Sequence, residues 1–64
     1  MKKYQKRVIQ EQKELQDKIN KLESFLGDYD KRLIPSKIEY SLLCKQLESM
    51  LTYNNILLER IDLF

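Results

Sequence analysis

Hydrophobic and polar positions alternate in a heptad pattern over residues 40–64. Apolar residues recur at intervals of three and four, interrupted once by Asn54. The a and d positions hold Tyr40, Leu43, Leu47, Met50, Asn54, Leu57, Ile61 and Phe64. This spacing places them on one face of an α-helix. Cys44, Leu51 and Leu58 at e positions widen that face, which favours a helix with more than one neighbour and predicts a buried thiol at Cys44.

A first helix is predicted over residues 2–26, with a weaker stripe. Its a positions hold Val8, Leu15 and Leu22. We assign Tyr4 and Phe25 to d positions and Ile19 and Leu26 to e positions. Glu11 and Lys18 occupy the d positions between Tyr4 and Phe25. The segment is rich in Lys, Glu, Gln and Leu, which are good helix formers. The sequence therefore predicts a long helix whose packed face contains more polar residues than that of the second helix.

The connector predicted over residues 27–35 begins with the only glycine and ends with the only proline. Gly27 can close the first helix in the left-handed conformation, and the proline cannot continue a helix. Ser36 and Glu39 then form the S-x-x-E pattern of a capping box. The second helix is accordingly predicted over residues 36–63.

Two long helices joined by a short connector predict an all-α fold, a single antiparallel hairpin over residues 1–64. A turn centred at about residue 31 would give opposed positions whose numbers sum to about 62. The expected pairs are Leu22 with Tyr40, Leu15 with Leu47, Val8 with Asn54, and Tyr4 with Leu58. Glu11 and Gln12 would lie about one turn from Asn54, in a polar layer that fixes the register.

The hairpin leaves apolar side chains without a partner. Leu42, Ile56 and Leu63 occupy c positions, away from the a, d and e columns. A 64-residue chain with a single cysteine also lacks an internal disulfide and has a marginal core. We therefore expect the hairpin to assemble with itself into a homo-oligomeric helical bundle.

Composition argues against catalysis and metal binding. The chain has no histidine, one cysteine and one glycine, so Cys/His zinc sites and glycine-rich phosphate loops are not expected. No serine or cysteine has a candidate base nearby, and the acidic residues have the spacing of solvated helix faces. The expectations are a protein that is not an enzyme and that uses no cofactor.

The candidate binding residues form two groups. Lys3, Tyr4 and Arg7, with Arg60 across the hairpin, combine cations with an aromatic ring, as in sites for phosphates and bases. The alternative is a solvated basic start with Tyr4 sealing the end of the hairpin. Tyr53 and Asn55 could line a pocket between subunits and contact a nucleobase. The alternative for this group is that Tyr53 is an interface aromatic beside a register-fixing asparagine.

The location and the other partners are expectations of the same kind. No secretory signal and no apolar run of about 20 residues is visible, so a cytoplasmic protein without a membrane partner is expected. Net charge is +2, and the basic residues of the first helix alternate with acidic ones. Nucleic-acid binding, which needs many cations on one face, is therefore expected to be weak at most.

One pattern of residues covers nearly the whole chain. It comprises Tyr4-Gln5-x-Arg7-Val8, Glu11, Glu14-Leu15, Lys18-Ile19, Lys21-Leu22 and Phe25, followed by Leu33, Leu42-Leu43, Gln46-Leu47, Met50, Tyr53, Ile56-Leu57 and Arg60-Ile61. Its distinctive parts are the start with Tyr4, Arg7 and Val8 and the end with Met50, Tyr53 and Arg60. This pattern resembles a family of very small helical-hairpin proteins of crAss-like and related phages. The resemblance implies a phage accessory protein in the host bacterial cytoplasm. The architecture is also loosely similar to viral sponges of cyclic-nucleotide immune signals, the anti-CBASS and anti-Thoeris proteins.

Three functional hypotheses follow. The first is an anti-defence protein that sequesters a cyclic or other nucleotide signal of the host between subunits, without catalysis. Its ligand-binding residues would be Lys3, Tyr4, Arg7, Tyr53, Asn55 and Arg60. The second is a helical module that binds a host or phage protein, and the third is a weak nucleic-acid binder.

Overall fold

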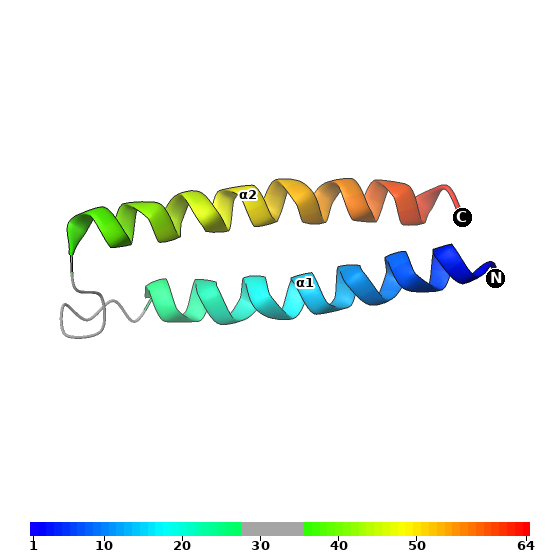
Figure 1. The fold of residues 1–64 in the computed structure, drawn as a ribbon, viewed down its shortest axis with the longest axis horizontal. Helices are drawn as coiled ribbons and strands as arrows, with labels where there is room; N and C mark the ends of the chain where they lie inside the picture. The colour runs from blue at the N-terminus through cyan, green and yellow to red at the C-terminus, as the bar shows by residue number, and fades with distance from the viewer. Residues whose placement is uncertain (28–35) are drawn as a thin grey trace.

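The computed structural model describes residues 1–27 and 36–64, and the connector beyond Gly27 lies outside the described residues. The described part contains two helices, α1 (Lys3–Gly27) and α2 (Lys37–Asp62), and no strand. They run side by side in opposite directions, with both termini at the same end (Figure 1). The chain is elongated, with extents of 46 × 14 × 14 Å. The predicted all-α hairpin is confirmed for one chain.

The start of α2 is set by a side-chain cap. Ser36 has an extended backbone (φ −153°, ψ 158°), and its hydroxyl accepts a hydrogen bond from the Glu39 amide at 3.1 Å. This satisfies one of the amides that a helix N-terminus leaves without a partner. The predicted cap at Ser36 is confirmed.

Gly27 differs from its expected conformation. It is the last residue of α1, and no described glycine has a positive φ. A Cβ atom built at Gly27 would meet nothing within 4 Å. The left-handed closure predicted from the glycine is therefore wrong, and α1 ends in ordinary helical conformation.

The packed face of α2 is the predicted seam. Asn54 and Leu57 are buried, and most other a and d residues are half-buried, namely Tyr40, Leu43, Leu47, Met50 and Ile61. The e column is not covered by the hairpin, because a single partner helix reaches only the a and d columns. Leu51 and Leu58 are 41% and 42% exposed, and Cys44 is exposed, so the expected buried thiol is wrong within one chain.

The packed face of α1 is rotated from the expected one. Val8 and Leu15 are buried as expected, but the second packed column is Gln5, Gln12, Ile19 and Leu26. Ile19 is 0% exposed, whereas Tyr4 and Phe25, which were assigned to the seam, are 48% and 37% exposed. The rotation buries an isoleucine and leaves Glu11 in water, where its charge is solvated.

The register is also about one turn from the expected one. Gln12 is hydrogen-bonded to Asn54, and the ring of Tyr4 contacts Phe64. The residue numbers of facing residues therefore sum to 66 and 68 and not to about 62. The expected pairing of Val8 with Asn54 would have placed a buried amide against a valine. The observed pairing gives that amide a hydrogen-bonding partner instead. The core of Val8, Leu15, Ile19 and Leu57 packs against Leu47, Met50 and Ile61.

Candidate functional site

A polar layer crosses the middle of the hairpin core. The Gln12 side-chain amide donates to Oδ1 of Asn54 at 3.2 Å, and Nδ2 of Asn54 donates to Oε1 of Gln16 at 3.1 Å. Asn54 is only 5% exposed, so both ends of its amide are buried and both have partners. Gln12 and Gln16 lie one turn apart on α1 and hold Asn54 between them. The predicted register device is present, but its partners are two glutamines.

Tyr53 lies beside this layer on the surface of the hairpin. Its hydroxyl donates a hydrogen bond to the Glu11 carboxylate of α1. Tyr53 as a whole nevertheless remains 44% exposed. The bond anchors the phenol tip and leaves part of the ring open to a stacking partner.

Glu11 and Arg60 both act on the Tyr53 phenol. The hydrogen bond to Glu11 is the main cause that raises the pKa of Tyr53 above its ordinary value of 10.0. Partial desolvation and the Glu11 charge act in the same direction, and the Arg60 charge opposes them. Arg60 is thus close enough to influence the phenol. Glu11 and Arg60 thus have opposite electrostatic effects on the Tyr53 phenol.

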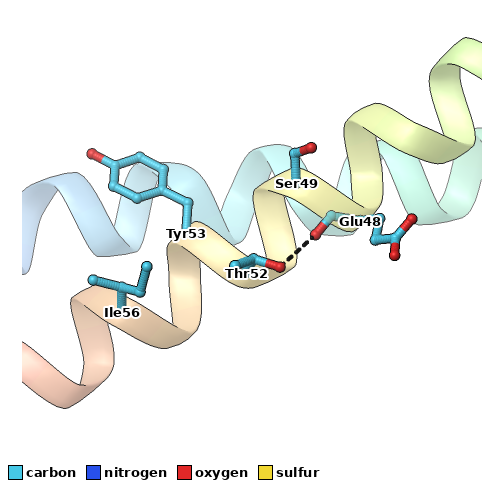
Figure 2. A pocket seen from close by; sticks show the side chains of 5 residues that line it. All are labelled: Glu48, Ser49, Thr52, Tyr53 and Ile56. Carbon is cyan, nitrogen blue, oxygen red and sulfur yellow. Dashed lines mark hydrogen bonds between the residues drawn. The ribbon is translucent and has the colours of Figure 1, made fainter.

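A shallow depression of about 390 Å³ adjoins this group. Its lining residues, all from α2, are Glu48, Ser49, Thr52, Tyr53 and Ile56. Figure 2 shows these side chains around a solvent-facing stretch of α2, with α1 behind it. The volume falls within the roughly 300–1,000 Å³ of small-ligand sites, but the depression has a wall on one side only. A ligand here would need a second wall to be enclosed.

Only Tyr53 of the lining residues was predicted from the sequence. Ser49, Thr52, Tyr53 and Ile56 follow the intervals of three and four that mark one face of a helix. That spacing could have indicated that these residues share a face, but the face mixes hydroxyl, aromatic and aliphatic side chains. No hydrophobic stripe distinguishes it.

Tyr4 lies at the open end of the hairpin. Its ring meets Phe64 edge to face, with centroids 5.9 Å apart and an interplanar angle of 84°. This contact closes the end of the hairpin, which is the structural role considered for Tyr4. The ring is also 48% exposed, so the contact does not occupy it fully.

Most of the predicted binding residues share one lateral side of the hairpin, which we call the Tyr53 flank. It comprises Tyr4, Arg7 and Glu11 of α1 with Tyr53 and Arg60 of α2. Arg7 precedes Glu11 by one helical turn, and Arg60 follows Tyr53 by two. Lys3 lies one turn before Arg7. Lys3, Arg7 and Arg60 are exposed.

Asn55 does not join this flank. It follows Tyr53 by two residues, which places it roughly 160° away around the α2 axis. Asn55 is exposed. A ligand on the Tyr53 flank could therefore meet Asn55 only from a neighbouring copy, and its binding role stays a prediction.

No group of three or more His, Cys, Asp or Glu residues in residues 1–27 and 36–64 could hold a metal ion. Neither α1 nor α2 is long and apolar enough to cross a membrane.

Comparison with known proteins gives one match. A family model described as Sequestin matches residues 2–63, nearly the whole chain. No curated protein and no solved structure matches the chain.

Proposed function

Since the chain belongs to the Sequestin family, we propose that it binds and sequesters a small nucleotide-derived immune signal of a host bacterium. The family name supports a sequestering, non-catalytic role. The nucleotide nature of the ligand and an origin in a phage that counters host defence are our additions. Under this proposal the protein acts in the host cytoplasm and lowers the concentration of free signal without breaking a bond.

The observation that carries the ligand class is the Tyr53 flank. An exposed phenol ring lies beside an open depression, with Arg60 in electrostatic reach. Arginine forks pair with phosphate oxygens, and aromatic rings stack on bases. Arg60, Arg7 and Lys3 would hold the phosphates, and Tyr53 and Tyr4 would stack on bases.

A neighbouring copy would complete the site. The depression is built by α2 alone and has no opposite wall. Leu42, Ile56 and Leu63 are 53%, 50% and 86% exposed, so this side of α2 has apolar surface for a second chain to cover. The neighbour would also supply Asn55, whose amide could read the edge of a base.

Thermal unfolding with a panel of cyclic di- and trinucleotides tests the proposal. A ligand at about 100 times its Kd stabilises the folded protein by about 2.7 kcal/mol. For a domain of this size the Tm should rise by more than about 10 °C. Arg60→Ala and Tyr53→Ala should abolish the rise, and the matched control Lys45→Ala, an exposed cation on the outer side of α2, should retain it. If no panel member moves the Tm, the nucleotide assignment is wrong.

A second candidate is a module that binds a host or phage protein. The exposed apolar residues Leu42, Ile56 and Leu63 favour it, because such a surface suits a protein partner as well as another copy. Native mass spectrometry of the purified protein separates the two. A retained small molecule supports sequestration, and a stoichiometric second polypeptide supports the module.

A further inference from the structure

The middle of the side of the hairpin opposite the Tyr53 flank is free of charge, whereas Lys2, Glu23 and Lys37 continue its columns toward the two ends. We call it the Leu51 flank and define it by Ile9 and Gln16 of α1 with Cys44, Leu51 and Leu58 of α2. Leu51 precedes Tyr53 by two residues and Ile9 precedes Glu11 by two, so each lies roughly 160° around its helix from the Tyr53 flank. Ile9 and Gln16 are half-buried, and Leu51 and Leu58 remain 41% and 42% exposed.

The chain exposes more surface than a compact monomer of its mass. A 7.8 kDa protein is expected to expose roughly 4,400 Å², and this chain exposes 5245 Å². The excess, roughly 850 Å², is close to the ~800 Å² that each partner contributes to a standard protein interface. Two hairpins packed face to face through an interface of standard size would each lose about this much exposed area.

The edges of the Leu51 flank have opposite charges. Lys6 and Lys13 follow the outer edge of α1, and Glu48 and Asp62 follow the outer edge of α2. All four side chains are exposed, and the one ion pair among the described residues joins Lys21 to Asp17 instead. A partner that places an acidic edge against the lysines and a basic edge against the carboxylates would complement both. A second copy has these two edges.

We propose that two copies pack through their Leu51 flanks around a two-fold axis parallel to the helices, giving an antiparallel four-helix bundle. Rotation about this axis sets α1 of each copy beside α2 of the other. The rotation does not shift one copy along the helices relative to the other. Because Tyr4 lies level with Phe64 within one chain, Lys6 lies level with the partner's Asp62. A two-fold axis across the helices would instead set lysine edge against lysine edge. Charge complementarity of this kind selects orientation more than affinity.

The lengthwise axis also orders the core layers. Residues of α2 on the flank meet their own counterparts across the axis: Leu58 with Leu58, Leu51 with Leu51, and Cys44 with Cys44. The apolar stretch from Cys44 to Leu58 spans about 21 Å of helix. Glu23, level with Cys44 on α1, marks its end. The Tyr53 flanks then lie on the outside of the dimer, so the neighbour that completes the ligand site would be a further copy on the other side of α2. This inference does not rest on the proposed ligand.

The mass of the assembly in solution tests whether the Leu51 flank forms the dimer contact. By sedimentation equilibrium the unmodified protein should be a dimer, or an assembly of such dimers where the contact on the Leu42 side also forms. Leu51→Glu should halve that mass, because the substitution places two carboxylates at the axis. Leu42→Glu acts on the other side of α2, the surface assigned above to the neighbour that completes the ligand site, so it should leave the dimer through the Leu51 flanks intact. A monomeric unmodified protein, or a dimer broken by Leu42→Glu and not by Leu51→Glu, overturns the proposal.

Cross-linking tests the axis without relying on a variant that must fold as a monomer. Bismaleimidoethane joins two thiols when each adds across one maleimide double bond, so no oxidant is needed. A lengthwise axis predicts covalent dimer both for the native Cys44 and for the double variant Cys44→Ser, Leu58→Cys. A crosswise axis can bring only one of these positions to its own counterpart, because they lie about 21 Å apart along α2. Linking at one position only, or at neither, overturns the axis. Cys44→Ser with Lys45→Cys, an exposed position on the outer side of α2, should give no dimer.

Discussion

The side-chain amide of Gln12 donates a 3.2 Å hydrogen bond to Asn54 across the core of the hairpin. Gln16 accepts from the other end of the same asparagine. A slip of the helices by one turn would keep apolar residues roughly in contact with apolar residues, but it would leave Asn54 buried without these partners. The layer therefore specifies register more strongly than the leucines around it.

Asn54→Ala should lower the free energy of unfolding by about 1–2 kcal/mol, because Gln12 and Gln16 lose their buried partner. Asn55→Ala is the matched control, since it makes the same change one residue away, where the side chain is exposed. Both substitutions gain the same helix propensity, so their difference in urea unfolding isolates the layer. Equal stabilities would show that the layer contributes nothing.

Leu57→Ala should remove most of the stability of the hairpin. Leu57 is 0% exposed, and deletion of such a side chain costs about 2–5 kcal/mol. Domains of this length rarely exceed about 3–5 kcal/mol in total. Circular dichroism at room temperature should therefore show a largely unfolded chain. Leu42→Ala, at 53% exposure, should change the stability by less than about 0.5 kcal/mol; a well-folded Leu57→Ala protein would contradict the assigned core.

Alkaline pH should weaken the fold through Tyr53. Its pKa is raised above 10.0 in the folded protein, chiefly by the hydrogen bond to Glu11, so folding favours the protonated phenol. The contribution is complete below pH 10 and is lost as the pH rises through the raised pKa. The ultraviolet titration of the unmodified protein minus that of Tyr53→Phe reports this group.

Glu11→Gln should move that titration back toward pH 10, because it removes both the carboxylate acceptor and its charge. Glu14→Gln makes the same change on α1 at a residue that pairs with Gln10, and it should leave the titration where it was. A Tyr53 titration that Glu11→Gln does not move would show that the phenol and the carboxylate are apart in solution.

Gly27→Ala should stabilise the protein by about 0.5–1 kcal/mol, because alanine restricts the unfolded chain more than glycine does. The site can accept the methyl group, since α1 ends there without a positive φ and with open space around the Cα. Thermal unfolding measures the effect. A loss of stability would restore the left-handed conformation that the glycine first indicated.

The sequence was sufficient for the helices and for the seam of α2, because that helix carries one continuous apolar stripe and a side-chain cap. It was insufficient for α1. Two neighbouring columns of α1 are equally apolar, one with Tyr4 and Phe25 and the other with Ile19 and Leu26. Which of them packs against α2 depends on which charged side chains would otherwise be removed from water. The structure buries Ile19 and solvates Glu11 and Lys18.

The register and the depression were beyond sequence reasoning for a different reason. The register was inferred from the midpoint of the connector, whereas it is set by which amide meets Asn54. The depression depends on how Glu48, Ser49 and Thr52 lie beside the Tyr53 ring, and side-chain positions do not follow from spacing. Only the gathering of Arg7, Tyr53 and Arg60 on one flank could be anticipated, and Asn55 lies off it.

The single wall of the depression has a consequence for kinetics. Affinity differences among related complexes arise mostly in dissociation rates, and a molecule resting on one helix can leave in any outward direction. A protein that lowers the free concentration of a signal needs a low Kd, which slow dissociation supplies. Under the proposed function, the second wall, more than any added contact on the first, would therefore decide whether a bound signal exchanges rapidly or is trapped.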